Sequence, residues 1–96
     1  MEIEITSEAA KWYKRELFVE DEAFVRFFVR YGGFGGRIPG FSVGISVEDQ
    51  PSTIYKSTEK ENVVFYIAES DAWYFEGNKL KIEIEEDGKE PKLIFE

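Results

Sequence analysis

A two-residue alternation of apolar and polar side chains constrains this fold more than any other feature. Phe41–Val47 and Leu80–Ile84 place an apolar residue at every second position, and so does one face of Val25–Tyr31. Successive side chains of a β-strand point to opposite faces, so this period is typical of strands with one buried face. We expect further strands at Val63–Ile67 and at the short Ile3–Ile5. The alternation therefore predicts a fold dominated by β-sheet.

One segment near the start follows a helical period instead. Its apolar residues, at helical spacing, are Ala9, Trp12, Tyr13 and Leu17. Thr6 or Ser7 is a candidate N-cap, because a hydroxyl there can accept a hydrogen bond from a free backbone N–H of the first turn. The spacing predicts one amphipathic helix that ends before the acidic turn at 20–22.

Local signals predict the shorter elements. They are a strand near Thr53–Lys56, a polar turn at Ser57–Asn62, a helical turn near residues 69–75 capped by Ser70 or Asp71, a type I′ hairpin turn at Asp87–Gly88 and a return strand at Leu93–Phe95. The predicted fold class is α+β, with one N-terminal amphipathic helix and a mainly antiparallel or mixed sheet. We expect residues 1–96 to form a single domain.

Composition excludes several functions. The chain has 12 Lys and Arg against 20 Asp and Glu, which gives a net charge of −8, and it has neither Cys nor His. Such an acidic chain repels phosphate backbones, so we expect no nucleic-acid partner. Without thiolates or imidazoles, no transition-metal site and no nucleophilic triad is expected, and no cofactor is predicted. No signal peptide or membrane span is expected, which favours a cytoplasmic protein.

The glycine-rich segment Arg30–Ser42 reads "RYGGFGGRIPGFS" and sets Phe34 between two glycine pairs. It does not fit a phosphate-binding loop, because the third glycine of that motif would fall at Ile38 and a strand rather than a helix follows. Two interpretations of Phe34 stay open. It folds back onto the core as a plug, or it anchors a partner protein as exposed aromatic side chains do.

Two stretches, "VRFFVRYGGFGGRIPGFSVGI" at 25–45 and "YIAESDAWYFEGNKLKI" at 66–82, resemble the HesB/IscA-type family of iron–sulfur cluster biogenesis, closest to its short HesB-like subgroup. The resemblance implies a single HesB-like domain of β-sandwich type over residues 1–96. In that family a cysteine lies within the glycine-rich loop, and Phe34 holds its position here. The C-terminal Cys-x-Cys pair of the family has no counterpart.

The resemblance and the missing thiolates together predict a non-catalytic protein that acts through protein contacts, in iron–sulfur cluster biogenesis. The residues expected to form the contact surface are Tyr31, Gly32, Gly33, Phe34, Gly35, Gly36, Arg37 and Phe41. Two alternatives stay open: a carrier of iron or a cluster that uses ligands from a partner or glutathione, and a small-ligand module or enzyme at the glycine-rich loop. A dimer through paired edge strands also stays open.

Overall fold

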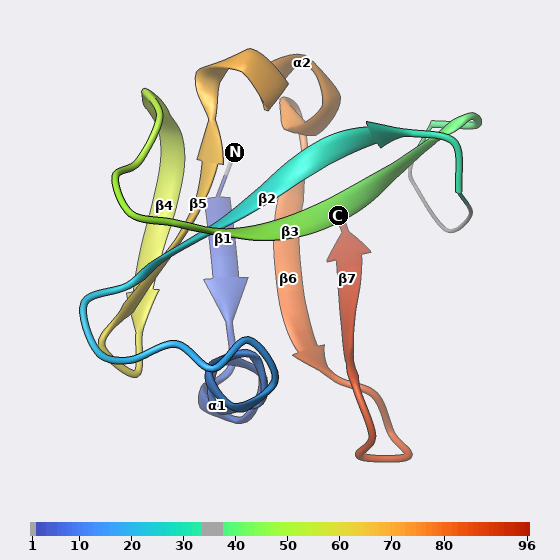
Figure 1. The fold of residues 1–96 in the computed structure, drawn as a ribbon. Coiled ribbons are helices and arrows are strands. Elements are labelled where there is room, and N and C mark those ends of the chain that lie inside the picture. Colours follow the sequence, from blue (N-terminus) through green and yellow to red (C-terminus); the bar gives the residue numbers. More distant parts are fainter. Residues whose placement is uncertain (1, 34–37) are drawn as a thin grey trace.

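The computed structural model describes residues 2–33 and 38–96 and shows a small α+β fold with two mixed sheets (Figure 1). The strands are β1 (Glu2–Ile5), β2 (Phe24–Tyr31), β3 (Phe41–Glu48), β4 (Ile54–Lys60), β5 (Val63–Ala68), β6 (Lys79–Ile84) and β7 (Pro91–Phe95). The helical elements are α1 (Ser7–Glu16), a 3₁₀ turn (Glu69–Asp71) and α2 (Ala72–Phe75). The predicted α+β class is confirmed, and α1 is the expected N-terminal helix.

The strands form a sheet of order β1-β6-β7 and a sheet of order β3-β2-β5-β4. The pairs β1–β6 and β2–β5 are parallel, and the other neighbours are antiparallel. In Figure 1, β2 and β3 cross in front of β6, with α1 at one end of the molecule and α2 at the other. This topology leaves β1 and β4 as the edge strands on one side and β3 and β7 as the edge strands on the other.

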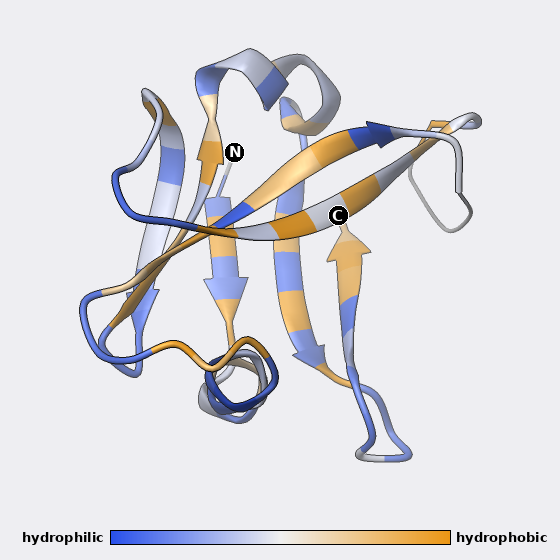
Figure 2. Cartoon of the chain, viewed as in Figure 1, coloured by the Kyte–Doolittle hydropathy of each residue, from blue (hydrophilic) through white to orange (hydrophobic). Residues whose placement is uncertain are grey.

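The hydrophobic core lies between the two sheets. Phe27 of β2 and Phe65 of β5 are fully buried, with ring centroids 6.2 Å apart, and Tyr13 of α1 meets Phe27 edge to face at 5.7 Å. The opposing sheet contributes Leu80 and Ile82, which are also buried. The bands of colour along β6 in Figure 2 follow the alternation that the sequence shows. Each fully buried side chain of this size stabilises the fold by roughly 1.5–3 kcal/mol.

The N-terminus of α1 has the predicted side-chain cap. The Thr6 Oγ1 atom accepts a hydrogen bond of 3.1 Å from the Ala9 backbone N–H, and Thr6 itself has an extended backbone. The helix ends at Glu16, with Leu17 as its C-cap. The Lys14 ammonium then bridges the Asp21 carboxylate at 2.8 Å and the Glu61 carbonyl at 3.0 Å, which fixes the acidic turn after the helix.

The polar turn predicted at Ser57–Asn62 is wrong for most of its length. Residues 57–60 belong to β4, and the turn is confined to Glu61 and Asn62, whose φ angles are +53° and +62°. In the described sheet β4 pairs with β5 along one edge, and its exposed residues Lys56, Ser57 and Glu59 carry polar side chains that stay solvated without a desolvation cost. Two positive φ angles in a two-residue connection are typical of a type I′ turn.

The predicted hairpin between β6 and β7 is present, but its turn is not the predicted type I′. Gly88 has a φ of +75°, whereas Asp87 is not among the described residues with positive φ. The Gly88 N–H donates to the Glu85 carbonyl at 2.8 Å, and the Asp87 carboxylate accepts from the Lys89 N–H at 3.0 Å. The return strand begins at Pro91, two residues before the predicted Leu93.

The predicted helical turn near residues 69–75 is confirmed, and Asp71 occupies the predicted N-cap position, at the start of α2. Its side chain makes no cap hydrogen bond, however, and the N-cap of the 3₁₀ turn is Ala68 rather than Ser70. Asp71 is only 7% exposed, and its carboxylate binds the Arg26 guanidinium on β2 instead. A charged partner on a neighbouring strand binds a carboxylate more strongly than a backbone N–H does.

Candidate functional site

The described parts of the glycine-rich segment form the base of the β2–β3 loop. The Gly32 N–H donates to the Gly40 carbonyl at 2.7 Å and closes this base. Gly33 has a φ of +80°, a backbone conformation that favours glycine. A Cβ atom there would also lie only 2.7 Å from the Ser42 hydroxyl oxygen, so a larger side chain has no room. Phe34, Gly35, Gly36 and Arg37 lie outside the described residues. The question whether Phe34 is a plug or an anchor therefore stays open.

Two of the predicted contact residues meet beside this loop, and a third aromatic residue joins them. Tyr31 and Phe41 have ring centroids 5.2 Å apart, and Phe41 meets Trp73 of α2 edge to face at 5.4 Å. Tyr31 is 90% exposed and Trp73 is 50% exposed. We call Tyr31, Phe41 and Trp73 the aromatic cluster. Exposed aromatic side chains held by their neighbours are typical anchors of protein interfaces.

The sequence did not reveal Trp73 as a surface residue. It stands in "DAWYF" beside Tyr74 and Phe75, and all three aromatics suit a sealed core. In the structure only Tyr74 and Phe75 are fully buried. The four-residue α2 cannot turn three consecutive side chains inward, because successive helical residues point about 100° apart.

The ion pair between Arg26 and Asp71 holds α2 and the 3₁₀ turn against β2. The Arg26 Nη2 atom donates to the Asp71 Oδ2 atom at 2.8 Å, and Asp71 Oδ1 accepts from the Val29 N–H at 3.3 Å. Glu48 lies on the other side, 3.7 Å from Arg26 Nη1. The hydrogen bond to Asp71 raises the pKa of Arg26 above its ordinary value. This network positions Trp73, two residues after Asp71, next to Phe41.

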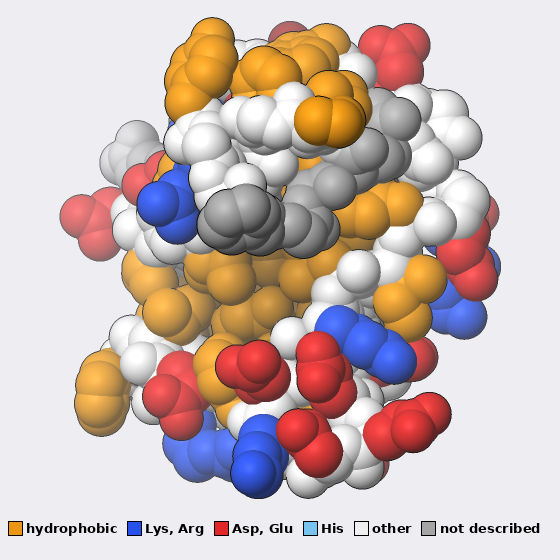
Figure 3. Space-filling view, turned by 90° about the vertical axis from the view of Figure 1, so that its right-hand side faces the viewer, with side chains coloured by type: hydrophobic (Ala, Val, Ile, Leu, Met, Phe, Trp, Pro, Cys, Tyr) orange, Lys and Arg blue, Asp and Glu red, His pale blue; other side chains and the backbone are white. Residues whose placement is uncertain are grey.

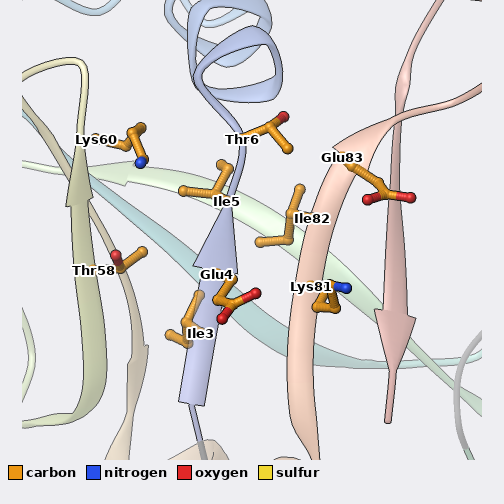
Figure 4. A pocket seen from close by; sticks show the side chains of 9 residues that line it. All are labelled: Ile3, Glu4, Ile5, Thr6, Thr58, Lys60, Lys81, Ile82 and Glu83. Atoms are coloured by element: carbon orange, nitrogen blue, oxygen red, sulfur yellow. The ribbon is translucent and has the colours of Figure 1, made fainter.

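A pocket of about 360 Å³ lies between β1 and β4, on a side of the molecule that sequence reasoning did not single out (Figure 4). Its lining residues are Ile3, Glu4, Ile5, Thr6, Thr58, Lys60, Lys81, Ile82 and Glu83. The Glu4 carboxylate accepts from the Lys79 ammonium at 2.9 Å, which lowers the pKa of Glu4. This pocket is open and its charges are of both signs, so its chemistry selects no particular ligand.

Two further hollows in the described part of the chain also lie away from the aromatic cluster. One is lined by residues 52–53 and 68–70, and the other lies between α1 and the β6–β7 hairpin. Within residues 2–33 and 38–96, no three or more acidic side chains gather in a way that could hold a metal ion. None of the helices described is long and apolar enough to span a membrane. A ligand or enzyme site at the glycine-rich loop thus gains no support from these hollows.

Comparisons with known proteins give relatives along the whole chain. A Bacillus subtilis (strain 168) protein named "Pyruvate dehydrogenase inhibitor" is 42% identical over 96 residues, which cover 100% of this chain and 98% of the relative. An uncharacterised protein of Staphylococcus saprophyticus is 38% identical over 86 residues, 88% of each chain. An uncharacterised protein of Staphylococcus haemolyticus is 35% identical over 85 residues, 86% of each chain. No family model and no solved structure matches.

These findings correct the resemblance to the HesB/IscA-type family. No model of such a family matches the chain, and the full-length relative with a functional name is named for pyruvate dehydrogenase, not for iron–sulfur clusters. The expected role in iron–sulfur cluster biogenesis is therefore wrong, and so is the alternative of a carrier of iron or clusters. The resemblance rested on a glycine-rich loop and an aromatic segment, which fix backbone shape and packing rather than chemistry. The chain belongs to the family of the Bacillus subtilis protein named pyruvate dehydrogenase inhibitor.

Proposed function

We propose that this protein inhibits pyruvate dehydrogenase by binding to it as a protein partner, and that it acts as a single, non-catalytic domain. One observation carries the proposal: 42% identity over the full length with a protein named for that inhibition. A similarity that covers both chains from end to end supports the same arrangement of elements in both proteins. The proposal therefore rests on similarity along the whole chain and not on a short shared motif.

The surface chemistry supports a protein contact. The aromatic cluster exposes Tyr31 and Trp73 and holds both against Phe41 at ring distances below 6 Å. Its two positions predicted from the sequence, Tyr31 and Phe41, remain proposed contact residues, and Trp73 joins them. Side chains that packing already holds in place lose little conformational entropy on binding. Such a cluster therefore gains more binding free energy for each unit of area that it buries. We propose that Gly32 and Gly33 serve this surface by setting the direction of the β2–β3 loop.

Co-sedimentation tests this proposal directly. Pyruvate dehydrogenase complexes are large particles, so a centrifuge pellets the complex while a free 96-residue chain stays in the supernatant. The proposal predicts that this protein pellets with the complex purified from the organism that encodes this protein and saturates at a fixed ratio. Its Bacillus subtilis relative with the Bacillus subtilis complex serves as the positive control. A chain that stays in the supernatant while the relative pellets would contradict the proposal.

A further inference from the structure

The edge strands β1 and β4 of the two sheets contact each other along one side of the molecule, which we call the closed side although the pocket described above lies on its surface. On the other side the edge strands are β3 and β7, whose core-facing residues stay only partly covered. We call these residues the open seam: Val43, Ile45 and Val47 on β3, and Leu93 and Phe95 on β7. Figure 3 shows apolar side chains gathered across the middle of this side of the molecule.

The strand register places the open seam at the margin of the core. Ile45 lies opposite Phe27, and Leu93 lies opposite Ile82, and both of these partners are fully buried. Ile45 and Leu93 share the inward face of their partners and yet stay half-buried, while Val47 is 45% exposed. In the described part of the chain, then, the inward side chains of the two edge strands are not sealed from solvent.

The aromatic cluster forms one end of the open seam. Phe41 begins β3 and meets Trp73, while Phe95 ends β7 and meets Tyr74 edge to face at 5.9 Å. Trp73 and Tyr74 are neighbours on α2, so this short helix bridges the two edge strands. The aromatic cluster therefore adjoins the ends of the two edge strands that carry the open seam.

β3 also offers an unprotected backbone edge. Its eight residues, "FSVGISVE", contain no proline and no lysine or arginine, and the single charge stands at the last position. β7 differs, since it begins with Pro91 followed by Lys92, two residue types that protect an edge from pairing. Among the described strands β3 has β2 as its one sheet neighbour, so its outer edge can accept an added strand, which is a common mode of peptide recognition.

The charge around the open seam selects the partner. The connection between β6 and β7 carries Glu85, Glu86, Asp87 and Glu90 against one lysine, Lys89. Figure 3 shows acidic side chains below the apolar area, with lysine or arginine side chains among them. A second copy of this chain also carries a net charge of −8, so two copies repel each other overall. A segment with lysine or arginine meets attraction there, so charge complementarity favours a basic partner over self-association.

We propose that the open seam is the docking site for an extended segment of the partner protein. The segment adds a strand to β3, places apolar side chains at alternate positions between β3 and β7, and sets lysine or arginine against the carboxylates of residues 85–90. This inference rests on the proposed function in one respect only, that the chain acts by binding another protein.

A model peptide tests the site without pyruvate dehydrogenase. The probe is a twelve-residue peptide that alternates valine and threonine and carries two lysines at each end; the control peptide has glutamates in place of the lysines. We expect the lysine peptide to shift the NMR amide signals of residues 41–48 and 91–95, and to bind about tenfold more tightly than the glutamate peptide. Shifts confined to β1 and β4, or equal binding of both peptides, would overturn the proposal.

Matched substitutions test the same site in the whole protein. Val43→Lys puts a charge into the open seam, whereas Ser57→Lys puts the same charge at an exposed position of β4. Glu90→Lys reverses a charge of the hairpin, and Glu59→Lys reverses an exposed charge on β4 at the closed side. We expect Val43→Lys and Glu90→Lys each to weaken peptide binding at least about threefold and both controls to leave it unchanged. Glu90 is exposed, so this variant keeps the test valid should Val43→Lys not fold.

The outcomes separate this inference from the proposed function. If the protein binds pyruvate dehydrogenase while Val43→Lys and Glu90→Lys bind it equally well, the open seam is not the docking site and the proposed function stands. If the lysine peptide binds at the seam while pyruvate dehydrogenase is not bound, the site stands and the proposed function fails. A concentration-dependent dimer that Val43→Lys abolishes would assign the seam to a second copy and overturn the proposal.

Discussion

Phe41 at the start of β3 and Trp73 on α2 meet edge to face, with ring centroids 5.4 Å apart and ring planes at 77°. The two residues are far apart in the sequence, and the contact joins the strand after the glycine-rich segment to the helix beyond β5. Trp73 is 50% exposed, so it presents one side to solvent while the other side rests on Phe41. The proposed interface depends on this contact.

Removal of the Trp73 ring should weaken both the fold and the binding. Trp73→Ala removes edge-to-face contacts with Phe41 and with Tyr74, each worth about 0.5–1.5 kcal/mol of stability. At an interface, loss of an aromatic anchor costs about 2 kcal/mol or more of binding free energy, a factor of about thirty. Urea unfolding and co-sedimentation with pyruvate dehydrogenase measure the two effects.

Phe18→Asn is the matched control for Trp73→Ala. Phe18 is 92% exposed and lies just after α1, and asparagine tolerates its φ of +53°. We expect this variant to bind pyruvate dehydrogenase as the unchanged protein does. Equal losses of binding in both variants would mean that exposed aromatic area in general, rather than the aromatic cluster, carries the affinity.

Two ion pairs of equal length should differ widely in their contribution to stability. Arg26–Asp71 and Lys14–Asp21 both measure 2.8 Å, but the side chain of Asp71 is 11% exposed and that of Asp21 is 63% exposed. Asp71→Ala leaves Arg26 without its main partner in a poorly solvated place and should destabilise the fold by about 3 kcal/mol. Asp21→Ala should cost about 0–1 kcal/mol. Denaturant unfolding at neutral pH measures both, and similar losses would contradict the assigned role of Asp71.

Stability should fall at alkaline pH because of Tyr13. The Tyr13 side chain is 2% exposed, and burial raises the pKa of its hydroxyl well above the ordinary value of 10. The folded state then keeps a proton that the unfolded chain releases, so the free energy of unfolding is unaffected below pH 10. Above pH 10 this one group removes about 1.4 kcal/mol per pH unit until its folded-state pKa is reached.

Tyr13→Phe isolates that effect, since it removes the titrating hydroxyl and keeps the ring contact with Phe27. Urea unfolding at about pH 8 and about pH 11 should show a smaller loss of stability for the variant than for the unchanged protein. An identical loss in both proteins would show that other groups cause the alkaline sensitivity.

Two substitutions in the turn between β4 and β5 should make the folded protein more stable. Glu61 and Asn62 both have positive φ angles, and glutamate has no local interaction that favours this region as asparagine and glycine do. Glu61→Asn combined with Asn62→Gly should stabilise the fold by about 1 kcal/mol and raise Tm by about 4–8 °C. The Glu61 carbonyl that binds Lys14 is retained. Calorimetry measures the change, and a lower Tm would contradict the assigned turn.

Local patterns predicted the elements well where one strand face is buried. The alternation placed β2, β3 and β6, and the hydroxyl of Thr6 marked the start of α1. Residues 57–60 were mistaken for a turn because an edge strand with a solvated face has the same polar composition as a loop. Asp71 was correctly predicted as an N-cap residue, but its side-chain partner was not predicted, because Arg26 is 45 residues away in the sequence.

The candidate site could be predicted only in part. Tyr31 and Phe41 border the glycine-rich segment and were proposed as contact residues from the sequence, whereas Trp73 joins them through tertiary packing. The open seam could not be predicted from the sequence. Alternating apolar residues indicate one buried strand face, whether the strand lies in the middle of a sheet or at its edge. The mistaken family resemblance has a related cause: a glycine-rich loop specifies a backbone path, which proteins of different function share.

Inhibition of pyruvate dehydrogenase is the most direct test of the account. The measurement is the rate of NADH formation from pyruvate by the complex of the organism that encodes this protein, with increasing amounts of this protein. We expect the rate to fall along a saturable curve, and the Trp73→Ala variant to need about thirtyfold more protein for the same effect. An unchanged rate at a large excess of this protein, while the Bacillus subtilis relative inhibits its own complex in a parallel assay, would contradict the account.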